Sequence, residues 1–251
     1  MPETNEIPDF LKYKYRHVGN GETWGDRKME LPDDKVFNRV VTIMRANPPH
    51  VNHTAMLREL CGKSVRVKLN LGSSNKFDKK NPFRIEERED MMRLALRDYG
   101  NFDLLRLPDV GDDDEWFKNL CEINGNFTEI LSNNDYDLKI YREHQYKAGH
   151  EGDEKHRKYD IIHPIDVIEK DKMMYVKGGI LQDGAIFIPV KKPLYVSGTF
   201  VRAAMVNDWN WENFVDSEVA KYIKKNGLVA RIREFCPELV GMPIEKFYDG
   251  R

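Results

Sequence analysis

Residues 39–53 read RVVTIMRANPPHVNH, and this segment is the most informative about the fold. Its first part, Arg39 to Met44, is a short β-branched apolar run, which is typical of a buried strand. A double proline follows and holds an extended turn, and a helix-like segment runs from Asn52 to Leu60, with Gly62 at its expected C′ position. We therefore predict a strand that passes through this turn into a helix.

The same alternation continues along the chain. Further strands are predicted at Ser64–Leu71, Phe102–Leu107 and Phe127–Leu131. Further helices are predicted at Arg84–Tyr99 and Asp112–Asn124, the latter starting with an acidic run that suits the positive end of a helix dipole. Strands that alternate with helices imply right-handed βαβ units, so the predicted fold class is α/β with a parallel sheet.

The alternation breaks at about residues 141–184, which we interpret as an inserted β-rich segment, a hairpin lid or a contact surface. Short antiparallel strands are predicted there at Asp160–Glu169 and Lys172–Ile180. The segment also holds many titratable side chains, but their spacing matches no common ligand pattern, so a solvated loop is favoured over a metal site. These side chains are His144, His150, Glu151, Asp153, Glu154, His156 and His163.

The core pattern resumes after the insertion and ends in C-terminal helices. A strand is predicted at Ala185–Val196, and helices are predicted from Thr199, at Ser217–Lys225 and at Leu228–Phe235. We divide the chain into an N-terminal extension (1–38), a main domain (39–236) that contains the insertion, and a C-terminal tail (237–251).

Charge and cysteine content exclude several classes of protein. The 251 residues carry 40 Lys and Arg against 42 Asp and Glu, which argues against a nucleic-acid coat and against an acidic disordered tail. Three cysteines without a CxxC pair argue against a disulfide scaffold. The polar start of the chain and the lack of 18 consecutive apolar residues predict a cytoplasmic protein with no membrane span.

Two imidazoles stand where the first strand passes into its helix. His50 and His53 are three residues apart, so they share one face at the helix start. Beside free backbone N–H groups they can contact phosphate oxygens. Helix-capping or core histidines are the alternative.

A second strand-to-helix turn has the sequence VSGTFVR, residues 196–202. Ser197 or Thr199 can cap the helix that follows, and Arg202 can reach a phosphate through charge-assisted hydrogen bonds. An ordinary N-cap with a solvated arginine is the alternative.

Together these stretches resemble the HxGH and (S/T)xTxxR signatures of Rossmann-like nucleotidyltransferases. The segments RANPPHVNH, LGSSNKFDKKNPFRIEER, LPDVGDDDEW, ILSNN and YVSGTFVRAAM occur in the order seen in archaeal-type nicotinamide mononucleotide adenylyltransferases. The resemblance covers roughly residues 39–140 and 185–236, and it implies a Rossmann-like parallel sheet flanked by helices.

Two positions depart from the family pattern. Asn52 replaces the glycine usual between the paired histidines, and Met44 replaces the glycine usual before Arg45. Glycine permits close approach of backbone to a ligand, so either change can reshape a nucleotide pocket. Asn52 is the milder change, whereas Met44 either presses on the adenosine or packs beneath it.

The resemblance implies transfer of the adenylyl group of ATP, bound with Mg²⁺, to nicotinamide mononucleotide, which gives NAD and pyrophosphate. By resemblance the catalytic residues are His50, His53 and Arg202, and Lys80 lies near the phosphates. The implied nucleotide contacts are Met44, Arg45, Ala46, Gly72, Ser73, Asn133, Ser197 and Thr199. The implied contacts to the nicotinamide end are Phe83, Asp109 and Trp116; a core aromatic of the third helix is the alternative for Trp116.

Other functions remain open on the sequence alone. A related nucleotidyltransferase could use CTP, or ATP with another phosphorylated acceptor, and a regulatory protein could bind nucleotide without turnover. The expected partners are small molecules, with no nucleic acid and no membrane. Members of the family often assemble, so a homo-oligomer is compatible with the resemblance.

Overall fold

A five-stranded parallel sheet forms the centre of the protein. The computed structural model describes residues 29–30, 36–132, 134–146, 149–162, 165–166 and 196–247. The sheet has the order β4-β3-β2-β5-β6, and every neighbouring pair is parallel. Its strands are β2 (Phe37–Met44), β3 (Ser64–Leu71), β4 (Phe102–Arg106), β5 (Glu129–Leu131) and β6 (Asp160–Ile162). The predicted α/β class with a parallel sheet is confirmed.

Helices cover both faces of this sheet. On one face, α2 (Val51–Lys63) and α3 (Ile85–Ala95) pack in one apolar cluster with Val40 of β2, and on the other, α4 (Asp113–Asn124) and α5 (Asp135–His144) pack with Val41. Successive strand residues point to opposite faces, so a strand covered on both sides must be apolar almost throughout. This explains the RVVTIM run that dominates the sequence pattern.

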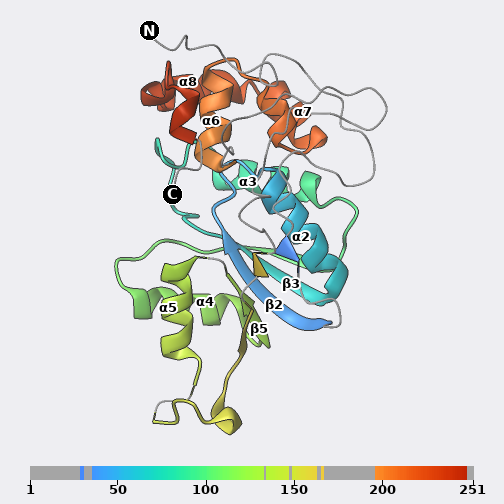
Figure 1. Ribbon diagram of the computed structural model, residues 1–251, viewed down its shortest axis with the longest axis vertical. Coiled ribbons are helices and arrows are strands. Elements are labelled where there is room, and N and C mark those ends of the chain that lie inside the picture. The colour runs from blue at the N-terminus through green and yellow to red at the C-terminus, as the bar shows by residue number, and fades with distance from the viewer. Residues whose placement is uncertain are drawn as a thin grey trace.

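The C-terminal helices form a third apolar cluster. They are α6 (Gly198–Val206), α7 (Ser217–Lys225) and α8 (Leu228–Phe235). The short 3₁₀ helix η3 (Trp211–Phe214) lies between α6 and α7, and two more, η4 (Pro237–Leu239) and η5 (Ile244–Phe247), follow α8. Figure 1 shows this group at one end of the molecule, and the loop near residue 150 at the opposite end. The predicted bounds of α7 and α8 are confirmed to the residue.

The end of α2 differs from the prediction. Gly62 does not stop the helix, which continues to Lys63 and passes directly into β3 at Ser64. Ser64 is already paired with Phe37 of β2, so the sheet register sets the strand start and leaves no room for a separate cap.

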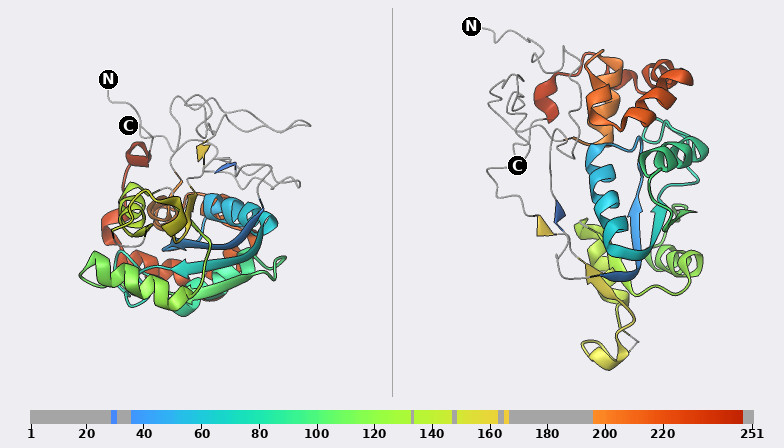
Figure 2. Two further views of the ribbon diagram at one scale, coloured as in Figure 1. Left: turned by 90° about the horizontal axis from the view of Figure 1, so that it is seen from below. Right: turned by 90° about the vertical axis from the view of Figure 1, so that its right-hand side faces the viewer.

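The predicted strand at Asp160–Glu169 is two short strands in the structure, β6 and β7. Its first part, β6, is parallel to β5 and belongs to the main sheet, so α5 and β6 extend the βαβ pattern to Ile162. In the described part of this range, β7 (Ile165–Asp166) is the antiparallel strand, and its partner is β1 (Met29–Glu30). Figure 2 shows this short pair apart from the main sheet, on the side that α2 covers.

Some predictions concern residues outside the described ranges. They include the strands at Lys172–Ile180 and Ala185–Val196, except for Val196 itself, most of the N-terminal extension, and His163. Among the described helices, none is both long enough and apolar enough to cross a membrane.

Candidate active site

A cavity of about 720 Å³ lies where the strands end and several helices begin. The ends of β2, β3 and β5 contribute to its wall, together with the first residues of α2, α5 and α6. Carboxyl ends of parallel strands and helix N-termini are the usual ligand-binding edge of such a sheet. Predicted site residues that line the cavity are His50, His53, Arg202, Met44, Arg45, Ala46, Gly72, Ser73, Lys80, Ser197, Thr199, Asp109 and Trp116.

The two imidazoles lie against each other at the start of α2. The ring centroids of His50 and His53 are 3.7 Å apart, with an angle of 28° between the ring planes. His50 occupies the N-cap position but its side chain accepts no capping hydrogen bond, so the helix-capping alternative is wrong. Both Nδ1 atoms are buried without a hydrogen-bond partner among the described residues. The two imidazoles therefore do not accept hydrogen bonds from the free backbone N–H groups of the first turn of α2.

Burial keeps both imidazoles neutral at neutral pH. It lowers the pKa of His53 to about 4, and burial together with the neighbouring His53 also lowers the pKa of His50. A neutral imidazole still donates one hydrogen bond, so the pair can contact phosphate oxygens without carrying a fixed positive charge.

These lowered pKa values predict a pH-dependent stability. An unfolded histidine binds its proton near pH 6.5. Since the folded protein resists protonation of His53 down to about pH 4, the unfolded state binds more protons between these values. The free energy of unfolding should therefore fall as the pH is lowered from about 6.5 towards 4.

Urea titrations at pH 7 and pH 5 measure this effect. The wild-type midpoint should drop more than that of the double variant His50→Gln/His53→Gln, which lacks both titrating rings. Equal drops in the two proteins would contradict neutral, buried imidazoles.

Arg202 is held at the cavity wall by the start of α6 and the turn after β2. Its Nη2 donates to Thr199 Oγ1 at 3.2 Å, and its Nη1 donates to the backbone oxygen of Asn47. Ser197 caps α6 by accepting from the N–H of Phe200 at 3.2 Å, as predicted. The two motifs, about 150 residues apart in sequence, thus lie in direct contact.

Gly198 permits this contact. A Cβ atom at this position would lie 2.9 Å from the backbone oxygen of Asn47, closer than side-chain carbons approach such atoms. A glycine is therefore required here by close packing of α6 on the turn after β2.

A second arginine lies beneath the cavity floor, fully buried. The Nη1 of Arg88 donates to the backbone oxygens of Arg45 at 2.9 Å and Gly72 at 2.7 Å, and its Nη2 donates to that of Ser73 at 3.0 Å. These three oxygens belong to the turns after β2 and β3, where Ala46 and Ser73 have positive φ angles of 47° and 50°. Arg88 therefore braces two turns whose backbone is in the left-handed region that most side chains avoid.

Burial lowers the pKa of Arg88 to about 10, which leaves it charged at neutral pH. The cavity consequently has a cation beneath its floor in addition to those at its wall. Arg88 belongs to the segment LGSSNKFDKKNPFRIEER, but no role was predicted for it from the sequence.

The other end of the cavity is formed by the segment after β4 and the start of α4. Trp116 is partly buried, lines the cavity and also packs against the apolar cluster of α4 and α5. Asp109 is held by Asn75, which accepts from its N–H at 2.9 Å and donates to its carbonyl at 3.0 Å. Asp112 caps α4 by accepting from the N–H of Glu115 at 2.8 Å, so the acidic run has the predicted helix-start role.

One predicted site residue, Phe83, is not brought to the cavity. Phe83 is fully buried in the C-terminal apolar cluster, and its N–H donates to the side chain of Asn47 at 3.2 Å. It therefore supports the turn after β2 from behind. Asn133 lies outside the described residues.

The cavity wall also contains residues for which no role was predicted, among them four polar ones: Ser132, Asn134, Tyr136 and Asp137. All follow β5, and Asn134 caps α5 by accepting from the N–H of Tyr136 at 2.9 Å. The hydroxyl of Tyr136 donates to Asp113 at 2.6 Å and so connects α5 to α4 across the cavity. Their position directly after a predicted strand was the available signal.

The two departures from the family pattern have distinct structural consequences. Asn52 lies inside α2, and its Nδ2 donates to the backbone oxygen of Val196 at 3.3 Å, which connects α2 to the segment before α6. Met44 is mostly buried in the cluster of α2 and α3 while still lining the cavity. The Met44 side chain therefore packs beneath the cavity and does not project into it.

Curated relatives share one name. Nicotinamide-nucleotide adenylyltransferases from Thermococcus sibiricus and Pyrococcus furiosus are 25% and 24% identical to this chain. The matches cover 80% and 81% of this chain, and 91% and 92% of the relatives. The relative of the same name from Picrophilus torridus is 23% identical, covering 78% of this chain and 96% of its own length. No family model matches the chain.

Among solved structures, a bifunctional NMN adenylyltransferase/ADP ribose pyrophosphatase from Francisella tularensis has a TM-score of 0.49 at 18% identity. It covers 78% of this chain and 53% of that protein. Over most of its length, this chain is therefore similar to the archaeal nicotinamide-nucleotide adenylyltransferases.

Proposed function

We propose that the protein transfers the adenylyl group of ATP to the 5′-phosphate of nicotinamide mononucleotide, giving NAD and pyrophosphate. The observation that carries the proposal is the meeting of His50, His53 and Arg202 in one cavity at the ends of parallel strands. The names of the curated relatives support the same reaction. The volume of the cavity, about 720 Å³, lies within the range of small-molecule sites.

The chemistry needs no protein nucleophile. An oxygen of the nucleotide 5′-phosphate, already an anion, attacks the α-phosphorus of ATP, and the bond from that phosphorus to the β-phosphate oxygen breaks. Pyrophosphate leaves with the electron pair, and no proton has to be removed. The protein therefore contributes by aligning two phosphates and by stabilising the charge that develops between them.

The cavity residues suit these two tasks. We assign the ATP phosphates to His50, His53 and the free N–H groups at the start of α2, with Arg45 and Lys80 beside them. Arg202, with Ser197 and Thr199, would hold the departing pyrophosphate. Met44, Ala46, Gly72 and Ser73 would lie under the nucleotide, and Asn133 would be a further contact to it.

The nicotinamide end is assigned to the segment after β4. Trp116 is the aromatic cavity residue contributed by α4, and it would stack on the nicotinamide ring, with Asp109 beside it. Phe83 would act only indirectly, through Asn47. ATP would enter as its Mg²⁺ complex. Within the described part of the chain, the cavity carboxylates do not converge into a group that could hold a resident metal ion.

A direct assay tests the proposal. Purified protein with ATP, Mg²⁺ and nicotinamide mononucleotide should form NAD and pyrophosphate in equal amounts, and omission of the mononucleotide should stop pyrophosphate release. A parallel series with CTP and with other phosphorylated acceptors tests substrate choice. Product from CTP alone, or tight ATP binding without any pyrophosphate, would overturn the proposed activity.

A further inference from the structure

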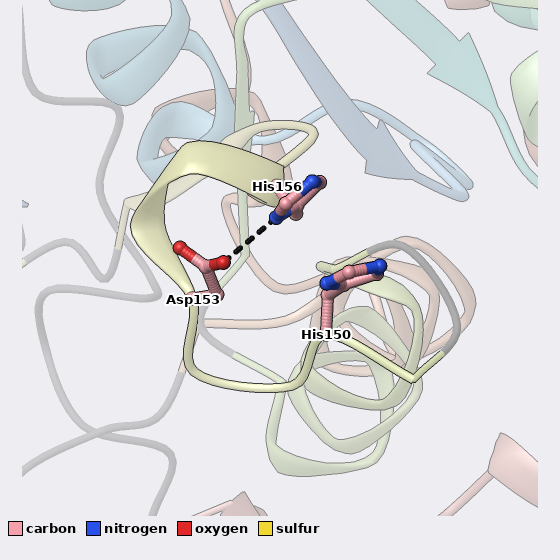
Figure 3. A group of neighbouring side chains, drawn as sticks. All are labelled: His150, Asp153 and His156. Carbon is pink, nitrogen blue, oxygen red and sulfur yellow. Dashed lines mark hydrogen bonds and ion pairs between the residues drawn. The ribbon is translucent and has the colours of Figure 1, made fainter.

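Three potential metal ligands converge in the loop between α5 and β6, far from the cavity. Figure 3 shows His150, Asp153 and His156 on the same side of this loop. One ligand atom from each lies within 4.8 Å of the other two. Nδ1 of His156 is 2.8 Å from Oδ2 of Asp153, and the two imidazole rings are stacked with centroids 3.8 Å apart.

Two consecutive backbone turns produce this convergence. The N–H of Asp153 donates to the oxygen of His150 at 3.0 Å, and the N–H of His156 donates to the oxygen of Asp153 at 2.8 Å. The first turn needs Gly152, whose φ of 81° lies in the left-handed region. The second is η1 (Glu154–His156), a 3₁₀ helix, in which residues three apart lie directly above each other. Because His150, Asp153 and His156 are each three residues apart, the two turns place their side chains next to one another.

The base of the loop is held by the body of the protein. The N–H of Lys158 donates to the oxygen of Gln145 at 2.8 Å, and the side chain of Gln145 donates to the oxygen of Tyr159 at 3.1 Å. Tyr159 is buried, and its hydroxyl donates to the oxygen of Tyr141 in α5 at 2.7 Å. The ligand set is thus presented on an anchored loop, which reduces the ordering that binding would require.

Neighbouring carboxylates have other partners. Glu151 accepts from the N–H of Gly149 at 3.0 Å, and Glu154 pairs with Arg157 at 2.9 Å. The cluster therefore offers two imidazoles and one carboxylate, with further coordination positions open to water. Imidazole and carboxylate ligands suit divalent first-row transition metals, and three protein ligands with an open position are typical of accessible zinc sites.

We propose that His150, Asp153 and His156 bind one divalent transition-metal ion of the Zn²⁺ type. Metal–ligand bonds of about 2.0–2.2 Å place ligand atoms roughly 3.3 Å apart in a tetrahedral site. The three ligand atoms already lie within 4.8 Å of one another, so binding would require them to approach by about an ångström or more. The ion crosslinks two successive turns and stabilises the loop.

This site is separate from the proposed active site. Asn134, at the start of α5, lines the cavity, whereas the loop follows the other end of that ten-residue helix. Such a helix is about 15 Å long, so an ion in the loop does not contact substrate in the cavity. The proposal is therefore independent of the proposed reaction.

Equilibrium dialysis of untagged, chelator-treated full-length protein tests the site, with Zn²⁺ as the probe and Mg²⁺ as the comparison ion. We expect one Zn²⁺ per chain and no comparable binding of Mg²⁺. The variant His150→Gln/His156→Gln should lower the Zn²⁺ affinity by roughly tenfold or more. His144→Gln, which changes a histidine of α5 outside the cluster, should bind Zn²⁺ like the wild type. Circular dichroism checks that both variants are folded.

A third variant separates this site from the histidine pair in the cavity. His50→Gln/His53→Gln should still bind one Zn²⁺ per chain. Zn²⁺ binding that is lost in this variant and kept in His150→Gln/His156→Gln would overturn the proposal. Failure of the wild type to bind Zn²⁺ would overturn it as well.

Discussion

Replacing His53 by alanine should lower kcat for NAD formation by about 100-fold or more, which is the usual cost of losing a hydrogen-bond donor to transition-state charge. His53 lines the cavity at the start of α2, stacked on His50. Because its contact is expected to strengthen only as charge develops on the phosphates, kcat and kcat/KM should fall together. Steady-state kinetics with ATP and nicotinamide mononucleotide measure both constants.

A matched histidine outside the cavity provides the control. His144 lies at the end of α5, stacked on Phe117 with ring centroids 4.4 Å apart, and its Nε2 is 3.1 Å from Asp114. His144→Ala should leave kcat near the wild-type value. If His53→Ala also kept kcat within about threefold of wild type, His53 would not stabilise the transition state.

Replacing Arg88 by methionine should destabilise the fold by about 3 kcal/mol, because buried carbonyl oxygens lose their donor. The oxygens of Arg45, Gly72 and Ser73 all accept hydrogen bonds from this one guanidinium. Methionine fills much of the same space without a donor. Urea unfolding measures the loss of stability. The turns at Ala46 and Ser73 should also lose the hydrogen bonds that hold them in the left-handed conformation. Because these turns line the nucleotide cavity, KM for ATP should rise.

An exposed arginine with good hydrogen-bond geometry is the matched control. Arg106 donates to Glu89 through two nitrogens at 2.8 Å each, but its side chain is 48% exposed. Arg106→Met should cost no more than about 1 kcal/mol, as is usual for surface ion pairs. Arg88→Lys should recover only part of the loss, since one ammonium group cannot span three carbonyls as a planar guanidinium does. Equal stability of Arg88→Met and Arg106→Met would contradict the bracing role.

The prediction of the sheet succeeded because its signal is local. The run RVVTIM and the alternating stretch Ser64–Leu71 carry their own evidence for strands, and β3 occupies that predicted range without change. The amphipathic pattern of Leu228–Phe235 likewise indicated α8 correctly. In each case a burial pattern repeats within a single element, so no knowledge of distant contacts is needed.

The membership of β6 in the sheet could not be predicted in the same way. Asp160–Ile162 is only three residues long, and its identity depends on pairing with Glu129–Leu131, about 30 residues earlier. A short strand has too few residues to show a periodic pattern. Its parallel alignment follows from the position of α5 against the sheet, which is a tertiary property.

The α/β class, the succession of strands and helices from β2 to β5, and the presence of histidines and an arginine at two strand-to-helix turns follow from the sequence alone. The positions of Arg88 beneath the cavity floor, of Phe83 behind it and of Ser132 and Asp137 in its wall depend on the tertiary structure. The physical reason is the range of the interactions involved. Strand and helix patterns arise from neighbours a few residues apart, whereas the cavity is built from contacts such as that of Arg202 with Asn47, 155 residues away.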